Sequence, residues 1–276
     1  MPSLAPTPSL SRFVEDVRVM EAVGDSPFEV ELLPDGRTGI YYRLTDGGRS
    51  ADLTVAGPRT RAKFKRATGV VHAVVFQFRP GWSTAVLGVA TSELTDRVVH
   101  LQDLWGHAAD DLRDELIAAG SVPVAIARLT DALAVRTRAA LESSSARIAR
   151  RAARLLEGDE VRVERVAAQL GVTARHLRRA FTESVGIGPK EFARAARLQR
   201  AVRMATTSTD WGRIAAAAGY YDQAHLITDF RALVGLTPGA FVKRATDRAA
   251  PHQDAAPPGL SVSSNRRAAP VAMLRP

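Results

Sequence analysis

Three arginines lie close together in the segment 173–185, and their spacing decides what chemistry they can perform. In a helix, Arg175, Arg178 and Arg179 fall on one side. The opposite side is apolar and contains Phe181. A guanidinium group can donate two hydrogen bonds to O6 and N7 of guanine in the major groove, and it also pairs with phosphate. The segment therefore predicts either a DNA-reading face or an ordinary solvated arginine face.

Other side-chain chemistries have little support in the sequence. The chain has no cysteine, which excludes disulfides, cysteine–zinc sites and thiol nucleophiles. Before residue 144 the histidines are His72, His100 and His107, which lie too far apart to predict a metal site. No nucleotide-binding glycine loop or Gly-x-Ser-x-Gly turn is present. We therefore predict no catalytic residue, no cofactor and no metal ion.

The elements that must position the arginines form an internal repeat. The segments 166–192 and 214–241 resemble each other, and equivalent residues such as Phe181 and Phe230 lie 49 positions apart. Each copy reads as a short alanine-rich helix, a turn glycine, a capped second helix and a second glycine. This order of parts is typical of a helix-turn-helix unit, so the repeat predicts two such units in tandem.

The second helix of each unit is expected over residues 173–185 and 222–234, with Thr173 and Asp222 as capping residues. In the second unit, helical spacing leaves a face that is far less basic than the arginine face of the first, so we expect weaker or less base-specific contact there. Its members are Gln223, Ala224, His225, Thr228 and Arg231.

A longer helix over residues 189–207 is predicted to join the two units. Four of its arginines recur every three residues, at positions 194, 197, 200 and 203. A period of three drifts around a helix, so they cannot all face one DNA strand. We expect some of them to meet phosphate and others to be solvated.

Charge is distributed unevenly along the chain. Residues 1–143 carry 16 Lys and Arg against 18 Asp and Glu, whereas residues 144–248 carry 19 against 10. The asymmetry predicts a polyanionic partner for the C-terminal part, with a solvated basic surface as the alternative. No apolar stretch is long enough to predict a membrane span, and the N-terminus lacks the pattern of a secretory signal.

The expected fold class is α+β. Residues 12–143 are predicted to form a β-rich domain with helices, and strands are expected over residues 28–33, 38–44, 51–56 and 70–78, with helices from about His107. An all-helical domain is expected over residues 144–247 and a disordered tail over residues 248–276, while residues 1–11 read as a loose arm.

Residues 163–243 resemble the DNA-binding domain of the AraC/XylS family of bacterial transcription regulators. The resemblance is strongest from Ala218 to Phe230 and continues from Gly235 to Phe241. It implies seven helices, with both recognition helices entering successive major-groove segments on one face of the DNA. By position, it places base contacts at Arg175, Arg178 and Arg179, and at Gln223, Ala224, His225 and Thr228.

The resemblance departs from the family pattern at two places. Thr228 stands where a basic residue is common, which weakens the prediction of specific readout by the second unit, and Gly188 replaces the usual Ser or Thr before Pro189. The N-terminal half is similar to an uncharacterised domain of some family members. In this family such a domain senses a small molecule or dimerises, often as a cupin-like barrel.

The leading hypothesis is therefore a sequence-specific, cytoplasmic transcription regulator. Its expected partner is double-stranded DNA, and RNA polymerase, a small-molecule effector and a second copy of the chain are further candidates. A repair alkyltransferase sharing this domain would need a nucleophilic cysteine, which the chain lacks. A non-specific architectural protein would use minor-groove wedges rather than two capped helix-turn-helix units.

Overall fold

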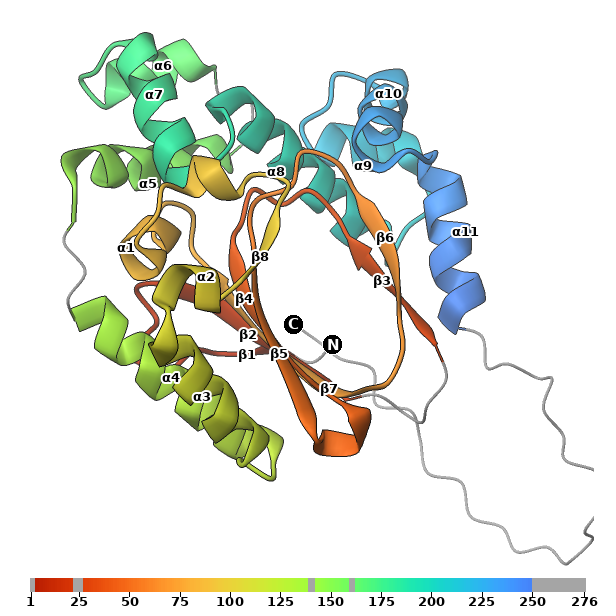
Figure 1. Cartoon of the computed structure of the whole chain (residues 1–276). Coiled ribbons are helices and arrows are strands. Elements are labelled where there is room, and N and C mark those ends of the chain that lie inside the picture. The colour runs from red at the N-terminus through yellow and green to blue at the C-terminus, as the bar shows by residue number, and fades with distance from the viewer. Residues whose placement is uncertain (1–2, 22–26, 139–141, 159–161, 250–276) are drawn as a thin grey trace, which may run out of the picture.

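Figure 1 shows the computed structural model of the chain, in which a β-rich N-terminal part is followed by a helical C-terminal part. The structure describes residues 3–21, 27–138, 142–158 and 162–249. Within these ranges, no helix is both long enough and apolar enough to cross a membrane. The predicted α+β class is confirmed. The predicted disordered tail lies, from residue 250 onward, outside the described residues.

A six-stranded antiparallel sheet forms the centre of the N-terminal part, with its strands in the order β1-β2-β7-β4-β5-β8. The strands are β1 (Ser3–Leu4), β2 (Val14–Glu21), β4 (Gly39–Thr45), β5 (Ser50–Ala56), β7 (Val70–Phe78) and β8 (Val98–His100). Two further strands, β3 (Phe28–Leu32) and β6 (Lys63–Ala67), pair with each other as a separate antiparallel ribbon.

The four strands predicted from the sequence are confirmed to within one residue at each end. The strands β1, β2, β6 and β8 are additional. The expectation that residues 1–11 form a loose arm is wrong, because Ser3 and Leu4 pair with β2 and Leu10 is fully buried. The Pro- and Ser-rich composition of this segment conceals one apolar side chain that completes the core.

One face of the sheet packs against helices. Tyr42 and Phe76 are buried in this core, and the Tyr42 hydroxyl donates a hydrogen bond to the carbonyl of Leu116 at 2.9 Å. Helices are found from His107 onward, as the apolar spacing predicts. The helical elements are η1 (Asp46–Gly48), α1 (Ser83–Leu87), η2 (Thr91–Leu94), α2 (Gln102–Trp105), α3 (His107–Ile117) and α4 (Val122–Arg138).

Seven helices follow in the described part of the C-terminal half, as the family resemblance implies. They are α5 (Ser144–Leu156), α6 (Val163–Gln169), α7 (Ala174–Val185), α8 (Pro189–Met204), α9 (Trp211–Ala217), α10 (Gln223–Val234) and α11 (Pro238–Ala249). The pairs α6–α7 and α9–α10 are the two predicted helix-turn-helix units. The connecting helix α8 ends at Met204, three residues before its predicted end.

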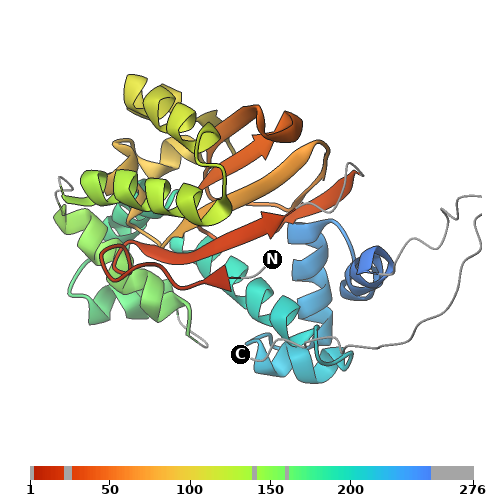
Figure 2. The ribbon, with the colours of Figure 1, turned by 90° about the horizontal axis from the view of Figure 1, so that it is seen from below.

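The helical part lies along one side of the sheet domain. Seen from below, α3 and α4 lie on one side of the sheet, whereas α8 to α11, drawn in cyan to blue, lie on the other (Figure 2). Each helix-turn-helix unit has an apolar core of its own, one around Phe181 and one around Phe230. Residues of the β3–β6 ribbon, including Phe64, pack against the second core. Both units therefore contact the N-terminal part.

Candidate nucleic-acid interface

The first predicted recognition helix, α7, is fixed by its cap and its buried side. Thr173 Oγ1 accepts a hydrogen bond from the backbone N–H of His176 at 3.1 Å, as expected of a capping residue. The ring of Phe181 is fully buried and meets the ring of Phe192 edge-on, with centroids 5.3 Å apart. Gly186 ends the helix with a φ of 92°. Cap and core together determine which side of α7 faces solvent.

That solvent side carries the predicted arginines, since Arg175, Arg178 and Arg179 are all exposed. Arg178 Nη2 donates to Oε1 of Glu164, on α6, at 2.7 Å, and both side chains are more than half exposed. An exposed ion pair of this kind contributes about 0–1 kcal/mol. A guanine edge or a phosphate can therefore displace Glu164 from Arg178 at small cost. No local sequence pattern predicts the role of Glu164, because its side chain meets Arg178 across the turn between α6 and α7.

The second recognition helix, α10, repeats this construction. Asp222 Oδ1 accepts a hydrogen bond from the backbone N–H of His225 at 2.7 Å. The rings of Phe230 and Phe241 meet edge-on with centroids 5.4 Å apart, as Phe181 and Phe192 do in the first unit. The two predicted caps and the predicted inward phenylalanines are therefore confirmed in both copies of the repeat.

All nine residues predicted to contact DNA are exposed. They occupy the N-terminal half of each recognition helix and its cap, apart from Arg231 in the third turn of α10. Their contact with DNA stays a prediction, because exposure is necessary for it and does not by itself establish it. The set comprises Thr173, Arg175, Arg178 and Arg179 in the first unit, and Gln223, Ala224, His225, Thr228 and Arg231 in the second.

The arginines of α8 correct one expectation. Arg194 Nε donates to Oδ1 of Asp229 at 2.8 Å, and an Nη atom of Arg197 lies 3.7 Å from the other carboxylate oxygen. Asp229 is buried on α10, so these two arginines fix α8 to the second unit. Beside them, burial and the charge of Asp229 raise the pKa of Tyr220 to about 12.

Arg200 performs a second structural task on α8. Its guanidinium donates to the carbonyl oxygen of Ala218 at 3.0 Å and to that of Glu157. These carbonyls lie at the C-terminal ends of α9 and α5, where the helix dipole favours a cation. The expectation that these arginines are solvated or meet phosphate is thus wrong for Arg194, Arg197 and Arg200, whereas Arg203 is exposed.

The N-terminal part contacts the end of the first recognition helix. Thr91 Oγ1 donates to the carbonyl of Ser184 at 2.9 Å, and Thr95 Oγ1 donates to that of Gly186 at 2.6 Å. A Cβ atom added to Gly186 would lie 2.5 Å from the ring of Pro58. The carbonyl groups at the end of a helix lack hydrogen-bond donors within that helix. At the end of α7, the N-terminal part supplies these donors.

The ribbon and the loop residue before β6 contact the second unit. The backbone N–H of Ala62 donates to the carbonyl of Leu233, near the end of α10, at 2.7 Å. On α11, Arg244 Nη2 donates to Glu29 Oε2 at 2.8 Å, and its guanidinium carbon lies 4.4 Å from the centroid of the Phe64 ring. Both recognition helices therefore end on the N-terminal part, one at η2 and one at Ala62, the residue before β6.

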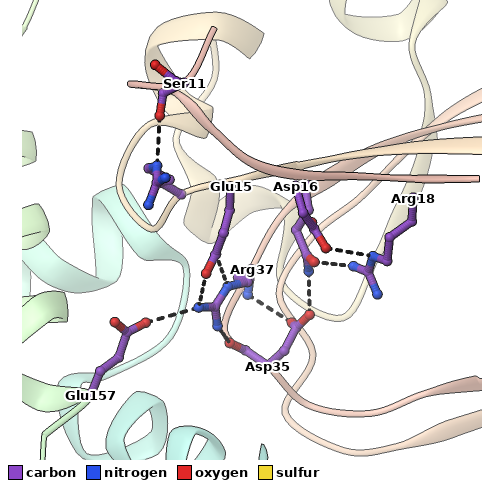
Figure 3. Close-up of polar contacts among 9 residues, drawn as sticks. Ser11, Glu15, Asp16, Arg18, Asp35, Arg37 and Glu157 are labelled. Carbon is purple, nitrogen blue, oxygen red and sulfur yellow. Dashed lines mark hydrogen bonds and ion pairs between the residues drawn. The ribbon is translucent and has the colours of Figure 1, made fainter. Parts of the chain in front are cut away.

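A polar cluster around Arg37 joins the two parts (Figure 3). Arg37 Nη2 donates to Glu15 Oε1 at 2.9 Å and to Oε1 of Glu157, at the end of α5, at 3.0 Å. Burial alone would lower the pKa of Arg37, but its hydrogen bond to Glu15 and the neighbouring carboxylates raise it. Burial raises the pKa of Asp35, against the hydrogen bond from the backbone N–H of Arg37. The arginine therefore stays charged at the contact between the two parts.

Comparison with known proteins supports this organisation. Residues 166–244 match the family model of a helix-turn-helix domain, and residues 3–100 match a domain of unknown function, DUF6597. A probable bifunctional transcriptional activator and DNA repair enzyme, AlkA, of Mycobacterium tuberculosis is 40% identical over 87 residues. The match covers 31% of this chain and 18% of that protein, and it concerns the DNA-binding part.

Among solved structures, ToxT from Vibrio cholerae O395 matches over 82% of this chain and 95% of its own, with 11% identity and a TM-score of 0.42. An AraC-type regulator from Chromobacterium violaceum matches over 40% of this chain and 99% of its own, with 24% identity and a TM-score of 0.34. The C-terminal part of this chain therefore carries a helix-turn-helix domain, and its two units are capped in the same way.

Proposed function

We propose that this protein regulates transcription by recognising a specific DNA sequence with α7 and α10, which enter successive major-groove segments on one face of the duplex. In this proposal Arg175, Arg178 and Arg179 read base edges in the first segment. The less basic face of α10 makes fewer base contacts and adds affinity through phosphate and shape.

The observation that carries the proposal is the repeated construction of two capped helices with exposed N-terminal halves, held in one frame by α8. Arg194 and Arg200 fix α8 to both units through Asp229, Ala218 and Glu157. Because these contacts are internal, Arg194 and Arg200 serve the frame, and in this proposal the exposed arginines of α7 read DNA.

The test uses the full chain and a pool of random DNA, from which bound sequences are selected. Affinity for the selected site and for a scrambled site is then measured at rising salt concentration. A specific regulator keeps a large ratio between the two affinities as salt rises, since counterion release affects both sites similarly. A ratio near one at every salt concentration would indicate a non-specific basic protein.

Arginine variants sharpen this test. Arg178→Ala or Arg179→Ala is expected to cost about 1–3 kcal/mol on the selected site and to relax base preference there. Arg203→Ala is the matched control, because it removes one exposed arginine of the same domain that lies outside both recognition helices. Equal losses for all three variants on selected and scrambled DNA would contradict base readout.

The N-terminal part is proposed to control this binding in response to a small molecule. This proposal is supported by its contacts with the ends of α7 and α10, through which a change in its shape can reach both units. We further propose action in the cytoplasm, contact with RNA polymerase at the regulated promoter, and dimerisation through the N-terminal part. Genome-wide mapping of bound sites tests whether the protein acts at promoters. Sedimentation of the full chain tests dimerisation.

A further inference from the structure

A cavity of about 470 Å³ lies between the six-stranded sheet and the β3–β6 ribbon. The face of the sheet that borders it is opposite to the face covered by α3 and α4. Its walls are mostly apolar, and its volume is in the range of cavities that hold small organic molecules. The apolar lining includes Met20, Phe28, Val30, Leu32, Tyr41 and Val75.

The charged residues of this lining are strongly biased toward one sign. Four are basic and one is acidic. Arg43 is paired with the acidic one, Asp52. The remaining three cations are Arg59, Lys65 and Arg66. A cavity with apolar walls and surplus positive charge favours an occupant that is partly apolar and negatively charged.

Arg59 is the most informative of these cations. Only 6% of its surface is exposed, and within the described residues its side chain forms no hydrogen bond and no ion pair. The nearby carboxylate of Asp35 contributes a favourable charge, but its oxygens accept from the Arg37 backbone N–H at 2.9 Å and from the Gln77 amide at 2.6 Å. A buried charge costs several kcal/mol unless a partner compensates it. Asp35 compensates the charge of Arg59 without a hydrogen bond, so the guanidinium keeps donors that a ligand in the cavity can engage.

We propose that this cavity binds a small organic anion, with its carboxylate or a similar anionic group on Arg59 and its apolar body between the ribbon and the sheet. Lys65 adds to the positive potential at the same wall. The inference rests on the proposed function, because it names the chemical class of the molecule that controls DNA binding. Ligand binding and DNA binding are nonetheless separate measurements.

The position of Arg59 explains how binding of such an anion can affect the recognition helices. Arg59 lies in the loop 57–62, between β5 and β6. In the same loop Pro58 lies against Gly186, at the end of α7, and Ala62 binds Leu233, near the end of α10. An anion that draws the Arg59 guanidinium toward the cavity therefore acts on the segment that contacts both units.

The experiment uses the full chain without DNA and two matched pairs of probes: phenylbutanoate with phenylbutanamide, and octanoate with octanamide. Affinities are measured by calorimetry. At least one carboxylate is expected to bind about tenfold or more tightly than its amide, because a charge-assisted hydrogen bond exceeds a neutral one by this margin. Equal affinity within both pairs, or no saturable binding of either carboxylate, would overturn the proposal.

Variants locate the anion. Arg59→Gln is expected to remove the preference for the carboxylate, and Arg59→Lys, which keeps the charge, is expected to retain most of it. Arg61→Gln is the control, because Arg61 lies two residues further along the loop and borders only a second space of about 310 Å³ beside α8 and α10, whereas Arg59 borders both spaces. An equal loss in Arg59→Gln and Arg61→Gln would place the anion in that second space and refute the assignment.

Thermal melting of the ligand-free variants provides the check on folding. Arg59→Gln is expected to melt close to the wild-type temperature, because Asp35 keeps its hydrogen bonds from the Arg37 backbone N–H and the Gln77 amide. A strongly lowered melting temperature would show that Arg59 has a protein partner and would overturn the proposal. If ligand-free Arg59→Gln still binds the selected DNA, the proposed DNA-binding function holds whatever the outcome of the anion-binding experiment.

Discussion

At the scale of single residues, two acidic side chains of the C-terminal part pair with arginines in contrasting ways. Asp229 is buried and holds Arg194 on α8 in a structural role. Glu164 is exposed and holds Arg178 only weakly. The same pairing of guanidinium with carboxylate thus produces a fixed joint in one place and a displaceable contact in the other, because burial differs.

Replacing the displaceable partner should strengthen DNA binding. Glu164→Gln removes the carboxylate that competes with DNA for Arg178, and affinity for the selected site is expected to rise about twofold to fivefold. Titration of labelled DNA measures this change. Glu183→Gln, which removes another exposed carboxylate from the same domain, is the control for net charge. An equal gain in both variants would show a general charge effect rather than release of Arg178.

Alkaline pH should weaken the second unit through Tyr220. Its pKa is raised to about 12 in the folded protein, so the folded state binds the phenolic proton more tightly than the unfolded state does. Its contribution to stability is complete below about pH 10 and is lost as pH rises toward about 12. Relative to Tyr220→Phe, the wild type is expected to lose roughly 1–3 kcal/mol over this range. Urea unfolding of both proteins at several alkaline pH values measures the difference, and parallel pH profiles would refute it.

At the scale of elements, the helix-turn-helix repeat could be predicted almost completely from the sequence. The caps, the turn glycines and the inward phenylalanines are local signals within one copy, and the second copy confirms each of them. The strand β6 could not be predicted, because the sequence Lys63 to Ala67 has three charged residues among five and pairs only with β3 in a two-stranded ribbon. In the folded protein, β6 contributes to both faces of the ribbon: Phe64 packs against the second unit, and Lys65 lines the cavity.

The contacts between distant elements could not be predicted from local sequence patterns either. Arg37 meets Glu157 across 120 residues, and Thr91 meets Ser184 across 93. A single sequence has no period or motif that relates residues so far apart. For the same reason the nine DNA-contact candidates could be predicted as exposed, whereas the carboxylate that already holds one of them could not.

The second unit depends on one buried ring. Phe230 is 1% exposed and contacts the ring of Phe241. Phe230→Ala is expected to cost about 3–5 kcal/mol of unfolding free energy, because it removes buried apolar surface and leaves a cavity. Tyr221→Ala is the control, since Tyr221 is 93% exposed and should be near neutral for stability. Chemical unfolding followed by circular dichroism measures both, and similar midpoints for the two variants would count against this packing.

At the scale of the whole molecule, the contact between the two parts depends on a glycine. A Cβ atom added to Gly36 would lie 2.4 Å from the ring of Phe192, so Gly36→Ala should separate the parts locally. Gly69→Ala is a close control, because Gly69 has nearly the same φ, +65° against +67°, and no atom lies within 4 Å of an added Cβ.

Both substitutions carry the backbone cost of a positive φ, but Gly36→Ala carries the steric overlap as well. We expect Gly36→Ala to lower the melting temperature more than Gly69→Ala and to increase protease cleavage between the parts. Differential scanning calorimetry and limited proteolysis measure these effects. Equal destabilisation by the two variants would show that the Phe192 ring can move aside for an added Cβ at Gly36 without a measurable cost.

The separate attachment of the two recognition helices has a consequence for the DNA that the protein can use. Since α7 ends on η2 and α10 ends on Ala62, next to β6, the rotation of one helix relative to the other is held by the β-rich part as well as by α8. Each base pair inserted between the two contacted segments rotates one of them around the duplex axis. The intact chain should therefore lose more affinity for an operator with inserted base pairs than a protein whose two units were held by α8 alone.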